Sequence, residues 1–108
     1  MTVESIAKNY VKEVRTALKD VPKEKRAAAL DIFLQGFVDA GSEQYTSKKL
    51  EDPDLQPLYD KGTYVRINFT RPEVDTATRV IDAEVTKLKE GLSRKSLWEY
   101  IFPHVSRR

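Results

Sequence analysis

The most apolar stretch of this chain, residues 27–40, constrains its fold more than any other feature. Its large apolar side chains recur every three or four residues, which places them on one stripe of a helix. They are Leu30, Phe33, Leu34, Phe37 and Val38. Burying each contributes roughly 1.5 to 3 kcal/mol, on the order of 10 kcal/mol in all before the entropy of folding is subtracted. The sequence therefore predicts a core helix here, onto which the other elements pack.

The composition is typical of one globular domain of 108 residues, with 40% hydrophobic and 33% charged side chains. Cysteine is absent, which excludes disulfides, thiolate nucleophiles and the usual structural zinc sites. The first residues do not resemble a secretory signal, and no apolar run approaches the roughly 20 residues that span a bilayer. We therefore expect a cytoplasmic protein that has no membrane partner.

Helix boundaries are marked by capping residues and prolines. Thr2 is a predicted N-cap for a first amphipathic helix, and Pro22 starts the second. Inside the second helix, Gly36 predicts a close approach by another helix, while Gly41 predicts a left-handed C-cap. Thr70-Arg71-Pro72-Glu73 has the spacing of a capping box and predicts the start of a long helix that continues to Leu92. A short last helix is expected from residue 97 to the proline at residue 103.

The middle of the chain has a different pattern. Residues 42–50 are predicted to form a short helix, and residues 51–62 an acidic loop interrupted by prolines. In residues 63–69, Val65, Ile67 and Phe69 alternate with polar residues, which predicts a short strand. Because one strand cannot satisfy its own backbone, it would pair with a second copy, pair with another protein, or lie extended over the helices. The sequence leaves these three alternatives open.

Together these signals predict a mainly α fold. We expect residues 1–108 to form a single-domain bundle of four to five helices, with one short extended segment near residues 63–69 and a frayed basic tail at residues 105–108.

No motif predicts catalysis, a metal site or a cofactor. His104 follows a proline near the end of the chain and has no acid at motif spacing. Asp52, Asp54 and Asp60 lack the central glycine and terminal glutamate of a calcium loop, and the glycines form no phosphate-binding pattern. We therefore predict a protein that is not an enzyme and needs no cofactor.

Two kinds of macromolecular partner remain. The first is another protein, or a second copy of this chain in a homo-oligomer, which an adaptor or assembly module would bind through aromatic and arginine side chains. The predicted contact residues are Tyr64, Arg66, Trp98, Tyr100 and Phe102.

The alternative partner is a nucleic acid, contacted by the basic last quarter of the chain. The predicted contact residues are Lys87, Arg94, Lys95, Arg107 and Arg108. Interleaved glutamates and a net charge of only +2 make this the weaker hypothesis.

Overall fold

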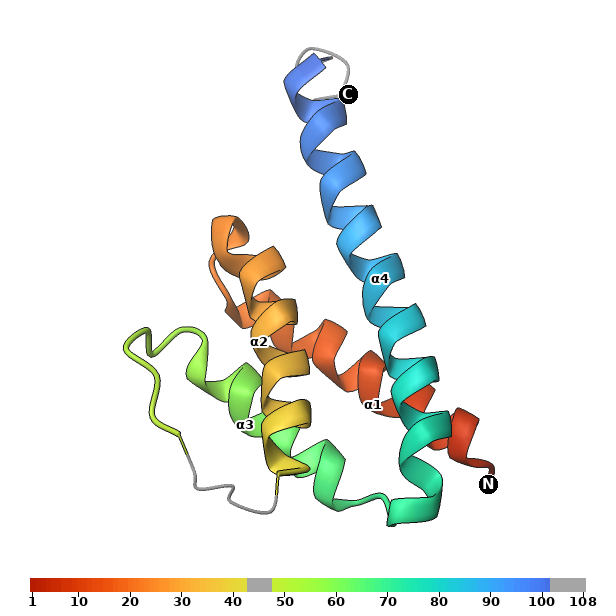
Figure 1. Ribbon diagram of the computed structural model, residues 1–108. Coiled ribbons are helices and arrows are strands. Elements are labelled where there is room, and N and C mark those ends of the chain that lie inside the picture. Colours follow the sequence, from red (N-terminus) through yellow and green to blue (C-terminus); the bar gives the residue numbers. More distant parts are fainter. Residues whose placement is uncertain (43–47, 102–108) are drawn as a thin grey trace.

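A computed structural model describes residues 1–42 and 48–101, with the side chains of residues 93–101 left out. The described residues form four α-helices, which confirms the predicted mainly α bundle (Figure 1). These are α1 (Val3–Ala17), α2 (Arg26–Ala40), α3 (Gln56–Ile67) and α4 (Arg71–Ile101). Two single 3₁₀ turns, Leu18–Asp20 and Lys23–Lys25, reverse the chain between α1 and α2. None of the described helices is both long enough and apolar enough to cross a bilayer.

The first helix begins at the predicted cap. The Thr2 hydroxyl accepts a hydrogen bond from the Ser5 backbone N–H at 3.1 Å, and the Thr2 N–H donates to the Ser5 hydroxyl at 3.1 Å. This reciprocal pair satisfies two of the backbone groups that a helix end leaves without partners.

We expect Thr2→Ala to lower the free energy of unfolding by about 1 kcal/mol, because it removes this acceptor at the helix end. Thr16→Ala is the matched control, since the Thr16 hydroxyl bonds only to the Lys12 carbonyl inside the same helix. Urea unfolding followed by circular dichroism measures both variants. Equal losses in the two proteins would contradict a capping role for Thr2.

The fourth helix also starts where the sequence predicts. The Thr70 backbone N–H and hydroxyl donate to the Glu73 carboxylate at 2.8 and 2.9 Å. These bonds lower the pKa of Glu73 below its ordinary value. Local sequence therefore determines this helix start.

The helices α2 and α3 cross at two buried glycines, Gly36 and Gly62. A Cβ atom placed on Gly36 would overlap the Tyr59 carbonyl oxygen, and one placed on Gly62 would lie 2.8 Å from the Phe37 backbone nitrogen. The close approach predicted at Gly36 is confirmed, and its partner is the backbone of α3.

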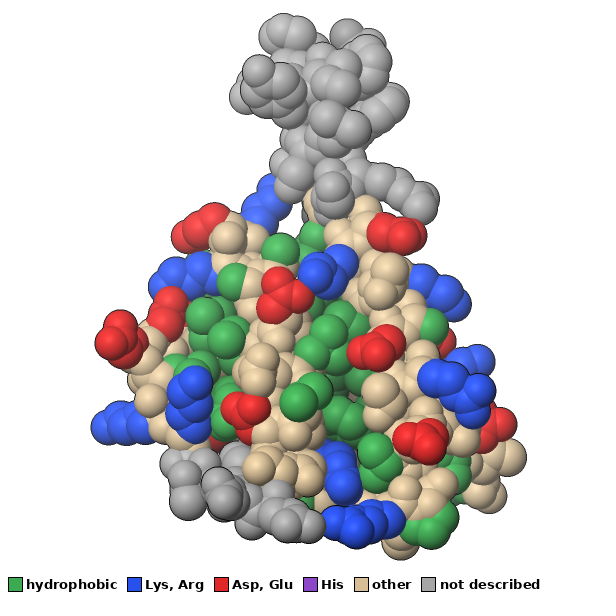
Figure 2. Space-filling model, viewed as in Figure 1, with side chains coloured by type: hydrophobic (Ala, Val, Ile, Leu, Met, Phe, Trp, Pro, Cys, Tyr) green, Lys and Arg blue, Asp and Glu red, His purple; other side chains and the backbone are tan. Residues whose placement is uncertain are grey.

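The core lies between two helix pairs, α2 with α3 and α1 with α4. The buried core side chains are mostly valine, leucine and phenylalanine, together with Tyr59. The largest fully buried ones are Tyr59, Phe33, Leu30, Leu58, Ile81, Val14, Val65 and Val85. In the view of Figure 2, apolar side chains also reach the surface in the middle of one face, between charged side chains of both signs.

The predicted strand at residues 63–69 is wrong. Residues 63–67 are the last part of α3, and Asn68 caps that helix. The residues that α3 and the turn after it bury are Leu58, Tyr59, Gly62, Val65 and Phe69, which recur with a helical period. Gly62 belongs to this buried face but carries no side chain, so an apolar pattern read from side chains misses it.

Three further expectations are corrected. The acidic loop ends at residue 55, because Pro57 lies in the first turn of α3, where a missing N–H costs nothing. The separate last helix is absent, because α4 continues without a break to Ile101. Gly41 has a φ of −82°, so it is not a left-handed cap. The predicted helix at residues 42–50 and the tail at residues 105–108 fall largely or wholly outside the described residues.

The described molecule is flat, with extents of 50 × 33 × 16 Å. At about 1.5 Å per residue, α4 alone is roughly 46 Å long, and it accounts for the longest dimension. Figure 1 shows its C-terminal end extending past the other three helices, away from α3. Such a shape leaves the seams between neighbouring helices open to solvent.

A candidate partner-binding groove between α1 and α4

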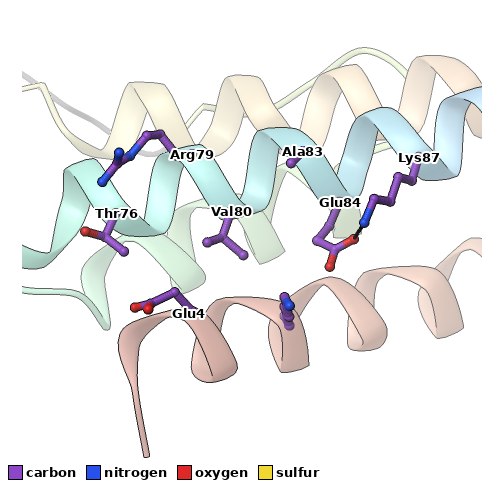
Figure 3. A pocket seen from close by; sticks show the side chains of 8 residues that line it. Glu4, Thr76, Arg79, Val80, Ala83, Glu84 and Lys87 are labelled. Carbon is purple, nitrogen blue, oxygen red and sulfur yellow. Dashed lines mark ion pairs between the residues drawn. The ribbon is translucent and has the colours of Figure 1, made fainter.

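A groove follows the seam between α1 and α4. It consists of two adjoining hollows, of about 440 and 330 Å³, which share the side chains of Lys8, Glu84 and Lys87. Glu4 lies opposite Thr76 at one end, and Arg15 lies near Leu88 at the other, so the two helices run in the same direction along the groove (Figure 3).

Each wall of the groove is one face of a helix. The wall residues recur every three or four positions, which is the spacing that aligns side chains along a helix. From α1 they are Glu4, Lys8, Val11, Lys12 and Arg15. From α4 they are Thr76, Arg79, Val80, Ala83, Glu84, Lys87 and Leu88.

The floor of the groove is apolar. Val11 is buried, Val80 and Leu88 are half-buried, and the exposed Ala83 lines the groove nearer to solvent. Along α4, Ala83 lies between Val80 and Glu84, and its side chain is the smallest of those drawn in Figure 3. Apolar surface at the bottom of an exposed groove is a feature of sites that bind helices or small molecules.

The rim of the groove is basic. It carries five cationic side chains, Lys8, Lys12, Arg15, Arg79 and Lys87, against Glu4 and Glu84. Lys87 pairs with Glu84 at 3.4 Å (Figure 3). Among the described residues, the side chains of Lys8, Lys12, Arg15 and Arg79 form no ion pair. Four unpaired cations therefore face one remaining carboxylate, Glu4.

Three lysines elsewhere on the described surface form ion pairs. Lys25 lies 3.0 Å from Asp52 and 2.9 Å from Asp54, which raises its pKa above the ordinary value. Lys61 pairs with Glu13 at 2.5 Å, and Lys89 pairs with Asp31 at 2.6 Å. These three lysines thus have carboxylate partners, whereas Lys8, Lys12, Arg15 and Arg79 line one groove without an ion pair.

The predicted contact residues Tyr64 and Arg66 lie on α3, outside this groove. Tyr64 is 50% exposed and packs edge-on against the Tyr10 ring, with the Lys61 ammonium 5.0 Å from its own ring centre. Arg66 is half-buried, and its guanidinium lies beside Gly41. Burial, together with the neighbouring Tyr64 and Glu13, raises the pKa of Tyr10 above its ordinary value. This cluster joins α1 to α3 and has its own internal partners.

Of the five predicted protein-contact residues, the structure describes the side chains of Tyr64 and Arg66. Trp98 and Tyr100 lie in the C-terminal part of α4, which points away from α3 (Figure 1), and their side chains are not described. Phe102 lies outside the described residues. On α3, the exposed apolar side chains are those of Tyr64 and Ile67, which neighbour each other on its outer face.

Of the predicted nucleic-acid contacts, Lys87 is the one whose side chain is described, and it lies in the groove with four unpaired cations. Arg94 and Lys95 lie in α4 with side chains not described, while Arg107 and Arg108 lie outside the described residues. The cations that share the groove with Lys87 come mainly from α1. The sequence analysis missed Lys8, Lys12 and Arg15, although their spacing of four and three residues places them on one helix face.

Within the described part of the chain, no three His, Cys, Asp or Glu side chains are close enough to hold a metal ion. The groove residues are cations, two carboxylates and aliphatic side chains, which can attract an anionic partner and bury apolar surface. Comparisons with protein-family models, with curated proteins and with solved structures find no match to this chain. The functional argument therefore depends on the geometry and charge of the groove.

Proposed function

We propose that this protein is a non-enzymatic binding module that receives a helical segment of another protein in the groove between α1 and α4. The observation that carries the proposal is the combination of an apolar floor with an unpaired basic rim along two aligned helix faces. Helix-in-groove recognition uses this arrangement, because the apolar face of the incoming helix is buried while its flanking residues meet the rim.

The dimensions support a helix as the bound element. From Glu4 to Arg15 the groove follows about 17 Å of α1, at 1.5 Å per residue, which is the length of about three helical turns. Three turns present apolar anchors at positions i, i+3 or i+4, and i+7, enough to cover Val80, Ala83 and Leu88.

Ala83→Gln is expected to weaken partner binding at least fivefold, because a long polar side chain would extend over the apolar lining of the groove. Its matched control is Ala28→Gln, at an exposed alanine on α2 away from the groove. Both substitutions keep the net charge and place a good helix former in a helix. Proteins retained from native extract by the wild type, Ala28→Gln and Ala83→Gln are compared by quantitative mass spectrometry.

The proposal predicts at least one protein that the wild type and Ala28→Gln retain and Ala83→Gln loses. Crosslinking of that protein to the bound chain should join it to α1 or α4. Identical sets of retained proteins for all three chains would overturn the proposal.

A second candidate function is nucleic-acid binding. It is supported by the position of Lys87 in the groove beside four unpaired cations. Phosphate binding would give an affinity that falls steeply with salt. Two features argue against this function. Glu4 and Glu84 lie in the same groove and would repel phosphates, and the apolar lining offers phosphates no favourable contact. A gel-shift series with duplex DNA and RNA at two salt concentrations separates the two functions.

A further inference from the structure

We infer that the partner of the α1–α4 groove is an acidic amphipathic helix, whose carboxylates face the rim formed by Lys8, Lys12, Arg15 and Arg79. This inference rests on the proposed function and adds the chemistry of the partner.

Charge complementarity is the first argument. Whatever helix lies in the groove brings its flanking residues close to the four unpaired rim cations. Lysine or arginine at those positions would face like charges, which costs free energy and selects against basic partners. Glutamate or aspartate would meet cations that have no competing partner among the described residues.

The distribution of charge along the groove is the second argument. Both hollows share Lys8, Lys87 and Glu84. The hollow near the end of α1 adds the cations Lys12 and Arg15, whereas the hollow near its start adds the cation Arg79 and the carboxylate Glu4. The end of the groove at Lys12 and Arg15 is therefore the more basic. We expect the carboxylates of the partner to be concentrated at that end.

The apolar floor is the third argument, because it separates an acidic helix from other polyanions. A nucleic acid or a soluble polyphosphate would leave Val80, Ala83 and Leu88 without apolar contacts. An amphipathic helix covers them and meets the rim in one binding event. An acidic helix with one apolar face therefore uses both features of the groove, whereas a nucleic acid or a polyphosphate uses only the basic rim.

Three synthetic helical peptides test the inference. They share one leucine face, differ only in carrying Glu, Gln or Lys on the flanking positions, and are about 18 residues long, since isolated helices shorter than about 12–15 residues are marginal in water. Fluorescence anisotropy measures their dissociation constants for the full chain. We expect the Glu peptide to bind about tenfold more tightly than the Gln peptide, and the Lys peptide to bind most weakly.

The rim is tested by the double variant Lys12→Glu/Arg15→Glu. It should weaken binding of the Glu peptide at least tenfold and tighten binding of the Lys peptide, because the charge at the basic end of the groove is reversed. Lys12→Gln/Arg15→Gln should give an intermediate loss of affinity for the Glu peptide. Because this variant only removes the two charges, it still tests the rim if the charge-reversed variant fails to fold. Lys49→Glu, on the exposed segment before α3, changes the charge elsewhere and should leave both affinities unchanged.

The outcomes separate the inference from the proposed function. Equal binding of the Glu and Gln peptides, both lost in Ala83→Gln, would overturn the acidic partner and leave the groove as a helix-binding site. Absence of binding by all three peptides would overturn both. Tighter binding of duplex DNA or RNA than of the Glu peptide, lost in the Lys12→Glu/Arg15→Glu protein, would replace both with the nucleic-acid function.

The salt dependence provides a further readout. At about 1 M salt the Debye length is about 3 Å, so exposed charges are screened. The advantage of the Glu peptide over the Gln peptide should then largely disappear, while the contribution of the leucine face persists. An advantage that is independent of salt would contradict the assigned role of the rim.

Discussion

Replacing Gly36 with alanine lowers the free energy of unfolding by about 3 kcal/mol and the melting temperature by roughly 10–20 °C. The added methyl group would overlap the Tyr59 carbonyl oxygen and lie 3.1 Å from its carbonyl carbon. These are backbone atoms inside α3, so no side-chain rotation relieves the overlap. The two helices must separate, which opens gaps around the buried rings of Phe33 and Tyr59.

Gly62→Ala should have a similar effect, because its methyl group would meet the backbone of Phe33 and Phe37 in α2. The double variant should lose less stability than the sum of the single variants. Once the first methyl group has separated the helices, part of the space for the second already exists, so the two substitutions are coupled.

The control for both variants is Gly91→Ala, at a helical glycine whose added Cβ meets nothing within 4 Å. It should raise the free energy of unfolding by about 1 kcal/mol, the intrinsic advantage of alanine over glycine inside a helix. Thermal unfolding measures all four proteins. If Gly36→Ala were as stable as Gly91→Ala, the two backbones would not approach as closely as the structure places them.

The features that the sequence predicts correctly are local. The caps at Thr2 and at Thr70 with Glu73 involve residues three positions apart, so their hydrogen bonds depend on little beyond the adjacent chain. The core helix at residues 27–40 is also predicted, but Val38 is 65% exposed. The buried face of α2 is rotated away from the predicted apolar stripe, because Gly36, and not Val38, lies against α3.

The features that the sequence misses depend on contacts between distant segments. To predict α3, Gly62 has to be counted as part of a buried face. That face becomes apparent only from the contact of Gly62 with the backbone of Phe33 in α2. The groove is a similar case. Spacing places Lys8, Lys12 and Arg15 on one face of α1, but only the pairing of α1 with α4 brings Arg79 and Lys87 to the opposite wall.

A second large effect is expected at the hydrogen bond between Tyr59 and Asp39. The Tyr59 side chain is buried, and its hydroxyl donates to the Asp39 carboxylate at 2.6 Å, while the Gln35 amide donates to the other carboxylate oxygen at 2.6 Å. The bonds from Tyr59 and Gln35 lower the pKa of Asp39 below its ordinary value of 3.8. Tyr59→Phe should therefore cost about 2 kcal/mol at neutral pH, within the range for a hydrogen bond to a charged group.

The pH dependence identifies the carboxylate as the partner. Because the pKa of Asp39 is lower in the folded chain than in the unfolded chain, its contribution is fully present above the unfolded value and is lost as the pH falls through the folded value. The difference between wild type and Tyr59→Phe should thus begin to shrink as the pH falls below about 4, and should be smallest below the folded pKa of Asp39, where only a weaker bond to the neutral acid remains.

Denaturant unfolding at neutral pH and at about pH 3 measures this difference. The control is Tyr64→Phe, because the half-exposed Tyr64 contacts Tyr10 through its ring, which phenylalanine keeps. Asp52 and Glu73 also have lowered pKa values, so acid destabilises the wild type as well as both variants. The comparison cancels that shared loss and leaves the part that belongs to Asp39. A difference between wild type and Tyr59→Phe that stays constant from neutral pH to pH 3 would show that the stabilisation comes from packing of the Tyr59 hydroxyl and not from its bond to a charged carboxylate.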